Sequence, residues 1–414
     1  MNRLPARPAL DDELGEKELA RLRAQTPAWG RYAHFAHGSA SLPPAAVHEA
    51  WDRWQAAERS LGTLRAMAQL EPELEAVRLA VARLVGAVPG QVALLDSAGH
   101  AWSTAMEAVL AAGREVHVVT SNDEYGSNSL CLLAARQRLG PQLGLTVISA
   151  RDEPVPLTQR LTDALDRLPR ACRAVVSLPI VPTAHGVATD LEGVAEVVRQ
   201  RDGLLFVDAS HAVGQLPVDV EALGCDVLVF PARKWLRGPK GAAVLVVSDR
   251  ALERLVAPPG VDVAGARWTA RDTLRVAADA RRFEGHEFNP GLRLALGAAC
   301  EEVLRIGPGR IARRNAEVRG RVAGTLRERL GWAPLEGDHP RASALMTYAL
   351  PPASGDGQTL VRALWEAGVN VSAVGLQYAR WALEAEGVPA VLRLTPHFLT
   401  AEDELDRLVK ALGG

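Results

Sequence analysis

Two residues, Asp208 and Lys234, have the types and spacing that the chemistry of pyridoxal phosphate (PLP) requires. Each comes shortly after an apolar run, 204–207 for the acid and 227–230 for the lysine. A lysine can hold PLP as a Schiff base, and an acid can keep the pyridine nitrogen protonated so that the ring accepts electrons. The Gly-Pro-Lys-Gly turn at 238–241 fixes the lysine at a tight corner. We therefore expect both side chains to contact the same cofactor.

The elements that must position these residues alternate between short apolar runs and amphipathic stretches. Apolar runs occupy 92–95, 115–120, 146–148, 174–178, 204–207, 227–230 and 243–247, and helical patterns such as 158–168 and 191–200 lie between them. Such alternation predicts an α/β fold with a mostly parallel sheet and helices on both faces. Ligands bind such sheets at the carboxyl ends of the strands, where Asp208 and Lys234 are expected.

The chain is long enough for more than one domain. We expect an N-terminal arm over residues 1–30, a large PLP-binding domain over 31–290 and a small α+β domain over 291–414. Residues 31–90 are expected to pack partly with the small domain. Helical patterns cover 44–61, 71–85, 290–306, 312–330, 357–367 and 401–412, and strand patterns cover 344–350 and 391–395.

Composition excludes several classes of protein. The 414 residues contain 47 basic and 49 acidic side chains, so no basic surface for nucleic acid is expected. No run of 18 apolar residues and no apolar leader occurs, which predicts a cytoplasmic protein without membrane contact. The four cysteines (Cys131, Cys172, Cys225 and Cys300) lack metal-ligand spacing, so no metal site is expected.

The segment 207–241 resembles class V aminotransferase-fold enzymes, which are PLP-dependent proteins of fold type I. The similarity extends over nearly the whole chain through segments 35–41, 97–102, 124–128, 280–284 and 393–398. Within this fold the chain looks most like hercynylcysteine sulfoxide lyase-like C–S lyases, and it is also similar to cysteine desulfurases and isopenicillin N epimerase. The resemblance implies PLP as cofactor, a small amino-acid-type substrate and a homodimer.

The resemblance also implies roles for residues that bind the cofactor. His211 matches a position that contacts the phenolic oxygen of the ring, and Arg233 stands where the desulfurases carry a histidine, from which it can bind the phosphate. Ala98, Gly99 and His100 match the phosphate-binding turn, although the family commonly has threonine where Gly99 stands. A histidine after a strand is otherwise more often a capping or core residue, so His211 rests on the resemblance.

Further roles concern the face of the ring and the substrate. Tyr125 matches a ring-stacking position, and Thr183 falls where the family has a polar residue near the substrate or the ring oxygen. Arg393 matches the arginine that pairs with the substrate carboxylate, and Asn128 and Ser39 are further substrate-binding candidates. Glu287 replaces a threonine that reaches the phosphate of the neighbouring subunit in many relatives. A carboxylate would repel phosphate, so that role is not transferred.

The expected reaction is inferred from the absence of a cysteine. Desulfurases relay sulfur through a mobile cysteine in the region matching 368–378, and no cysteine follows Cys300 here. We therefore expect α-deprotonation by Lys234 and β-elimination at a C–S bond of a cysteine S-conjugate or sulfoxide. The alternative is an epimerase or aminotransferase on the same scaffold. An epimerase needs a second acid, for which Tyr125, His100 and His185 are the candidates.

Overall fold

The computed structural model describes residues 13–151, 154–350 and 357–413. A seven-stranded sheet with the strand order β2-β8-β7-β6-β5-β3-β4 forms its centre. Its strands are β2 (Val92–Leu95), β3 (Val116–Ser121), β4 (Leu143–Ile148), β5 (Arg173–Pro179), β6 (Leu204–Asp208), β7 (Val227–Pro231) and β8 (Ala243–Val247). Strand β8 runs antiparallel to both neighbours, and the other pairs are parallel. The predicted mostly parallel α/β sheet is confirmed.

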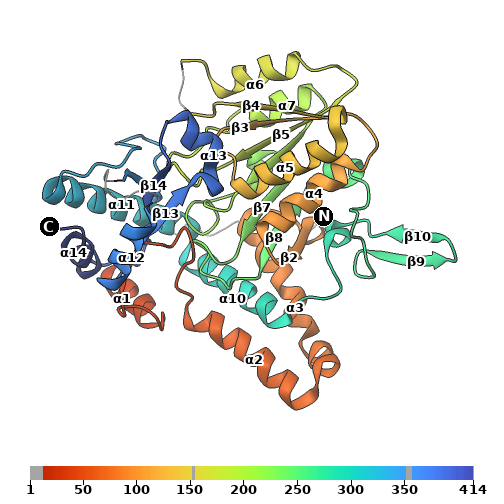
Figure 1. The fold of residues 1–414 in the computed structure, drawn as a ribbon. Helices are drawn as coiled ribbons and strands as arrows, with labels where there is room; N and C mark the ends of the chain where they lie inside the picture. Colours follow the sequence, from red (N-terminus) through yellow and green to blue (C-terminus); the bar gives the residue numbers. More distant parts are fainter. Residues whose placement is uncertain (1–12, 152–153, 351–356, 414) are drawn as a thin grey trace.

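The sheet is covered on both faces because its strands alternate between two cores. In β6, Leu204 and Phe206 pack with helices α4 (Ala98–Leu110) and α5 (Gly126–Leu139). Leu205 and Val207 pack with α6 (Leu157–Asp166) and α7 (Val194–Gln200) on the opposite face (Figure 1). A strand buried on both faces needs a continuous apolar run, which explains why these strands were easy to locate in the sequence.

Three helices form one end of the molecule. Helix α2 (Ala45–Leu61) and helix α3 (Thr63–Val85) pack against α10 (Pro290–Ile306) (Figure 1). The predicted helix over 71–85 was too short, because α3 starts at Thr63 and contains Pro72 in its interior. Ala66 and Leu70 are buried against Trp54 and Leu294. This packing stabilises the turns before the proline, where the sequence alone indicates a break.

The C-terminal part is a smaller layer of helices around a three-stranded antiparallel sheet, β11-β14-β13. Its elements are α11 (Pro308–Leu330), β11 (Met346–Ala349), α12 (Gln358–Glu366), β12 (Val369–Asn370), β13 (Ser372–Gly375), α13 (Leu376–Ala385), β14 (Ala390–Leu394) and α14 (Glu402–Ala411). Helix α11 begins at Pro308, four residues before the prediction, because proline is tolerated at the first helical position. The N-terminal strand β1 (Ala33–His34) pairs with β12, so residues 33–34 join this layer.

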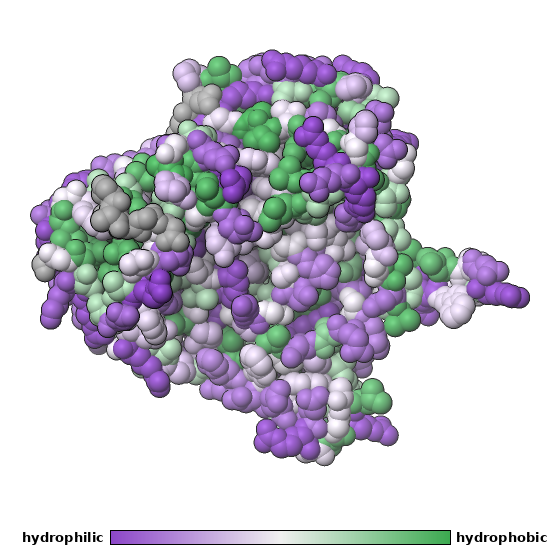
Figure 2. Space-filling view, viewed as in Figure 1, coloured by the Kyte–Doolittle hydropathy of each residue, from purple (hydrophilic) through white to green (hydrophobic). Residues whose placement is uncertain are grey.

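The remaining α-helices and strands are short. They are α1 (Glu16–Ala24), α8 (Val220–Leu223), α9 (Asp249–Arg254) and a hairpin of β9 (Ala266–Ala270) and β10 (Thr273–Val276). The hairpin, which the sequence did not predict, projects from the body with Trp268 exposed at its surface (Figure 1). Figure 2 shows hydrophilic and hydrophobic residues mixed over the same face of the molecule. Among the described residues, no helix combines the length and the apolar character needed to cross a bilayer.

Candidate active site

Lys234 lies in a cavity of about 450 Å³ at the carboxyl ends of β6 and β7. Residues within 96–99, 125–128, 208–210 and 231–242 line this cavity, so four separate stretches of chain meet there. Lys234 is buried, and burial lowers its pKa to about 7. Asp208 opposes this change, whereas Arg233 and Arg393 add to it. At neutral pH a large fraction of Lys234 is therefore the uncharged amine, the form that attacks a carbonyl carbon.

Asp208 ends β6 and is held in place by two hydrogen bonds. The Ser210 backbone N–H donates to Oδ1 over 2.8 Å, and the Asn128 amide donates to Oδ2 over 3.3 Å. Asn128 also donates to Glu124 Oε1 over 2.9 Å, so a single amide joins two buried carboxyl groups. The predicted substrate-binding residue Asn128 thus contacts the predicted acid Asp208.

Glu124 extends this acid network beneath the cavity, and sequence reasoning did not single it out. The Ser177 hydroxyl donates to Oε2 over 2.6 Å, and the Tyr125 backbone N–H donates to Oε1 over 2.9 Å. Burial raises the pKa of Glu124, the Ser177 hydrogen bond lowers it, and the charge of Asp208 raises it. The only signal in the sequence was its place directly before Tyr125 in a segment already linked to the cofactor ring.

Arg393 forms a second group of contacts on the small layer, on strand β14. Its Nη2 donates to Ser39 Oγ over 2.7 Å, its Nη1 to Thr183 Oγ1 over 2.7 Å, and its Nε to Ser372 Oγ over 3.2 Å. Burial lowers its pKa to about 10. No carboxylate within the described parts of the chain forms an ion pair with Arg393. A buried guanidinium whose hydrogen-bond partners are only hydroxyl and carbonyl groups favours binding of an anion.

His211, Tyr125 and Arg233 lie around the lysine. His211 Nε2 is 3.0 Å from Lys234 Nζ, and the Tyr125 ring centroid is 5.6 Å from the same nitrogen. Tyr125 also stacks with Tyr378, the ring centroids being 6.5 Å apart, and Tyr378 was not predicted as a site residue. Arg233 lines the cavity and donates to the Ser39 carbonyl, which brings the N-terminal segment to the site.

The expected phosphate turn forms the start of α4 at the other side of the cavity. Ser97 caps the helix by accepting a hydrogen bond from the His100 backbone N–H over 3.2 Å, and Ala98 and Gly99 line the cavity. The first turn of a helix offers backbone N–H groups and a positive dipole end to an anion. Lys240, exposed and also lining the cavity, adds a cation that sequence reasoning missed. Its position in the Gly-Pro-Lys-Gly turn was the available signal.

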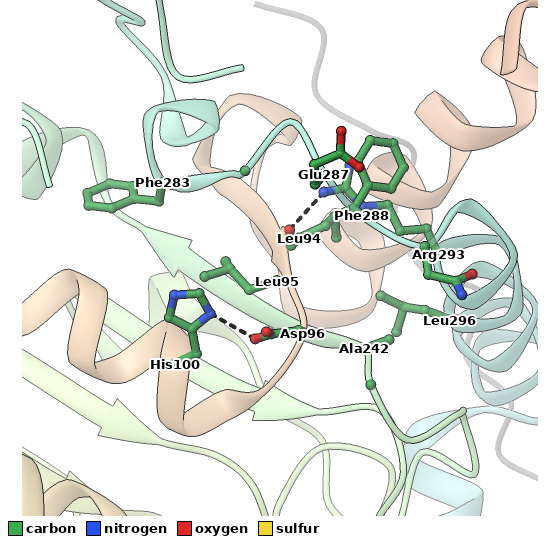
Figure 3. Close-up of a pocket in the computed structure, with 13 residues that line it drawn as sticks. Leu94, Leu95, Asp96, His100, Ala242, Phe283, Glu287, Phe288, Arg293 and Leu296 are labelled. Carbon is green, nitrogen blue, oxygen red and sulfur yellow. Dashed lines mark hydrogen bonds and ion pairs between the residues drawn. The ribbon is translucent and has the colours of Figure 1, made fainter. Parts of the chain in front are cut away.

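The ring of His100 lies apart from these groups. It contacts Asp96 Oδ1 over 2.8 Å in an adjoining pocket of about 120 Å³, which Glu287 also lines (Figure 3). His185 lies in a third pocket together with Arg151 and Glu386. Among the described residues, the structure therefore gathers the other predicted site residues near Lys234 but separates the His100 and His185 side chains from it.

The groups around Lys234 fit PLP. A buried uncharged amine suits its aldehyde, and a hydrogen-bonded carboxylate suits the pyridine nitrogen. A helix start, Arg233 and Lys240 suit the phosphate. Within the described residues, no His, Cys, Asp and Glu cluster suitable for a metal ion occurs.

Comparison with known proteins gives one consistent family. The family model for class-V aminotransferases matches residues 34–408. A "Probable hercynylcysteine sulfoxide lyase" of Mycobacterium tuberculosis is 31% identical over 347 residues, covering 82% of this chain and 79% of that protein. Isopenicillin N epimerase of Streptomyces clavuligerus is 29% identical over 350 residues, covering 81% and 82% of the two chains.

Solved structures agree on the fold. The apo cysteine desulfurase of Thermococcus onnurineus superimposes with a TM-score of 0.82 at 21% identity, over 95% of this chain and 96% of that one. A mutant C-DES with glycine covalently linked to its PLP cofactor superimposes with a TM-score of 0.78 at 18% identity, over 94% and 98%. Fold type I, expected from the sequence, is confirmed.

Proposed function

The chain belongs to the class-V aminotransferase family, whose cofactor is PLP, and on that premise we propose that it is a C–S lyase. The proposed substrate is a cysteine S-conjugate or its sulfoxide. For a sulfoxide the net reaction consumes water and yields pyruvate, ammonia and a sulfenic acid, so that one C–S bond breaks and no redox partner is needed. When bound, PLP supplies an electron sink for the bonds at the substrate α-carbon.

The observation that carries the proposal is a buried amine in a cavity that no thiol lines. None of the cavity residues is a cysteine, and Cys225 and Cys300 are buried elsewhere in the hydrophobic core. The region 368–378, which matches the region that carries the sulfur-relay cysteine in desulfurases, contains no cysteine. Sulfur that leaves the β-carbon therefore has no protein thiol to receive it within the cavity, which favours release of the sulfur fragment over persulfide transfer.

Four side chains have separate roles in the proposed reaction. Arg393 binds the substrate carboxylate through its planar guanidinium, whose contacts with Ser39, Thr183 and Ser372 fix its orientation. Lys234 Nζ, in its uncharged form, accepts the proton from the α-carbon. With PLP bound, Asp208 would hold a proton at the pyridine nitrogen, and the Tyr125 ring, whose centroid is 5.6 Å from Lys234 Nζ, would contact the cofactor ring. The likeness to the named sulfoxide lyase supports the choice of substrate class.

A panel of S-substituted cysteines and their sulfoxides tests the proposal. We expect pyruvate and ammonia in equal amounts from at least one sulfoxide, and no activity from Lys234→Ala. Loss of optical rotation with solvent deuterium at the α-carbon and no pyruvate would instead indicate an epimerase. A stable amino form of the cofactor after substrate addition would indicate an aminotransferase. Either result would overturn the lyase proposal.

A further inference from the structure

Trp235, directly after Lys234, is completely buried and contacts His211 on the side away from the lysine. Its indole Nε1 is 3.3 Å from His211 Nδ1. An indole nitrogen can only donate a hydrogen bond, so His211 Nδ1 must be the acceptor. A neutral imidazole carries a single N–H, and this contact places that hydrogen on Nε2. Nε2 faces Lys234 Nζ at 3.0 Å.

The surroundings of His211 leave Nδ1 little choice of partner. A Cβ at Gly38 would be 3.4 Å from His211 Nδ1 and 2.9 Å from the Thr395 methyl group, so the N-terminal segment packs closely against this edge of the ring. Trp235 is held in turn by His397, whose ring stacks at 6.1 Å and whose Nε2 is 3.4 Å from the Trp235 carbonyl oxygen. The indole N–H is thus held against one nitrogen of His211.

The charges around His211 also favour its neutral form. The groups whose charge acts on its ring are Lys234 in its protonated form, Arg393 and Arg233, all of which are cations. Burial, followed by these charges, holds the pKa of His211 well below its usual range. A protonated ring would also present an N–H to the Trp235 N–H, which is repulsive. His211 therefore stays neutral, with a donor on the nitrogen that faces Lys234.

We propose that Trp235 is a positioning residue that fixes His211 as a neutral Nε2–H donor directed at Lys234 Nζ, the amine that lines the cofactor cavity. The inference rests on the proposed PLP site. A neutral donor suits an anionic oxygen of the cofactor, and it also suits the lone pair of the Lys234 amine. With the opposite tautomer, Nε2 would present a lone pair to either acceptor, and the contact would be repulsive. Trp235 thereby acts on the cofactor through His211 without touching it.

The direct test reads the tautomer of His211 by nitrogen NMR. Holoenzyme labelled with ¹⁵N at histidine would be compared with Trp235→Phe, and the His211 signals would be identified by their absence in His211→Gln. We expect protonated Nε2 and unprotonated Nδ1 from pH 6 to 9 in the natural protein. In Trp235→Phe we expect a mixture of tautomers or protonation within this range. Trp102→Phe is the matched control, because Trp102 is equally buried and donates to Ser177, and it should leave the His211 signals unchanged.

A double-mutant cycle separates this role from a structural one. Trp235→Phe should lower kcat about threefold to tenfold in the His211 background, the range for one hydrogen bond. The same change should have little effect in His211→Gln, because an amide has no tautomer to fix. Protonated Nδ1 in the natural protein, an unchanged tautomer in Trp235→Phe, or an equal kcat loss in both backgrounds would overturn the inference. Because the NMR readout needs no substrate, its result does not depend on whether the enzyme is a lyase.

Discussion

The two sides of the Lys234 cavity are built in opposite ways. On the acid side, Asp208, Asn128 and Glu124 form one hydrogen-bonded network at the end of β6 and beyond the end of β3, the two strands that flank β5. On the cation side, Arg393 is held by hydroxyl groups from three distant segments and has no acidic partner among the described residues. The carboxyl groups on the acid side satisfy one another through shared hydrogen bonds, whereas an unpaired buried cation favours a ligand that brings the missing charge. This difference supports our proposal that the acid side binds the cofactor ring and the cation side binds the substrate.

We expect the largest effect, a fall in kcat, from removing the charge of Asp208 on the acid side. In Asp208→Asn the cofactor should still attach to Lys234, but kcat should fall by roughly 10³-fold, the scale of a lost electrostatic contact in a buried site. Steady-state kinetics and visible absorbance measure both properties. Asp226→Asn is the matched control, since Asp226 is also buried but pairs with Arg250 outside the cavity. A fall in kcat of less than tenfold in Asp208→Asn would contradict this role.

We expect the second-largest effect, a loss of substrate affinity, from replacing Arg393 on the cation side. In Arg393→Lys the planar fork is lost, and KM should rise by roughly 10²-fold while cofactor absorbance stays unchanged. Arg319→Lys serves as control because Arg319 is buried in the same layer and donates to the Gly337 carbonyl. An unchanged KM, or loss of the cofactor rather than of substrate affinity, would show that Arg393 does not bind the substrate carboxylate.

Replacing Glu124 tests whether the residues of the acid side act as one coupled network. Glu124→Gln should lower kcat by about tenfold, because the amide joining it to Asp208 loses a charged acceptor. In the Asp208→Asn background the same change should cost clearly less, with a coupling energy of at least about 0.5 kcal/mol. Kinetics of the four proteins give this cycle. Simple additivity of the two changes would mean that Glu124 acts independently of Asp208.

The smallest expected effect is the pH dependence of the rate at which the apoenzyme captures PLP. Because burial lowers the pKa of Lys234 to about 7, its uncharged amine predominates above that pH. The rate at which apoenzyme captures PLP should rise as the pH increases through about 7 and then level off. Stopped-flow absorbance measures this rate. A rate that keeps rising tenfold per pH unit up to pH 9 would indicate an ordinary exposed lysine instead.

The sequence predicted the sheet and the strand-end positions of Asp208 and Lys234 better than the rest of the site. Asp208 and Lys234 follow buried strands whose apolar runs are continuous, so their positions follow from local pattern. The contact of Arg393 with Ser39 joins residues 354 positions apart, and only the resemblance to a family pointed to it. Glu124, Lys240 and Tyr378 were missed because no local pattern distinguishes a buried network or a cavity wall from an ordinary loop. The hairpin at 266–276 was missed because few of its residues are buried, which leaves little apolar signal.

Chemical identification of the lysine that holds the cofactor tests the central claim most directly. The chain has four lysines, Lys17, Lys234, Lys240 and Lys410, and only Lys234 is buried. Borohydride reduction of the holoenzyme fixes a carbonyl cofactor onto its amine, and peptide mass spectrometry then locates the added mass. We predict that the label falls on Lys234 alone and is lost in Lys234→Ala. A label on Lys240, or one that persists in Lys234→Ala, would contradict the assignment of this cavity.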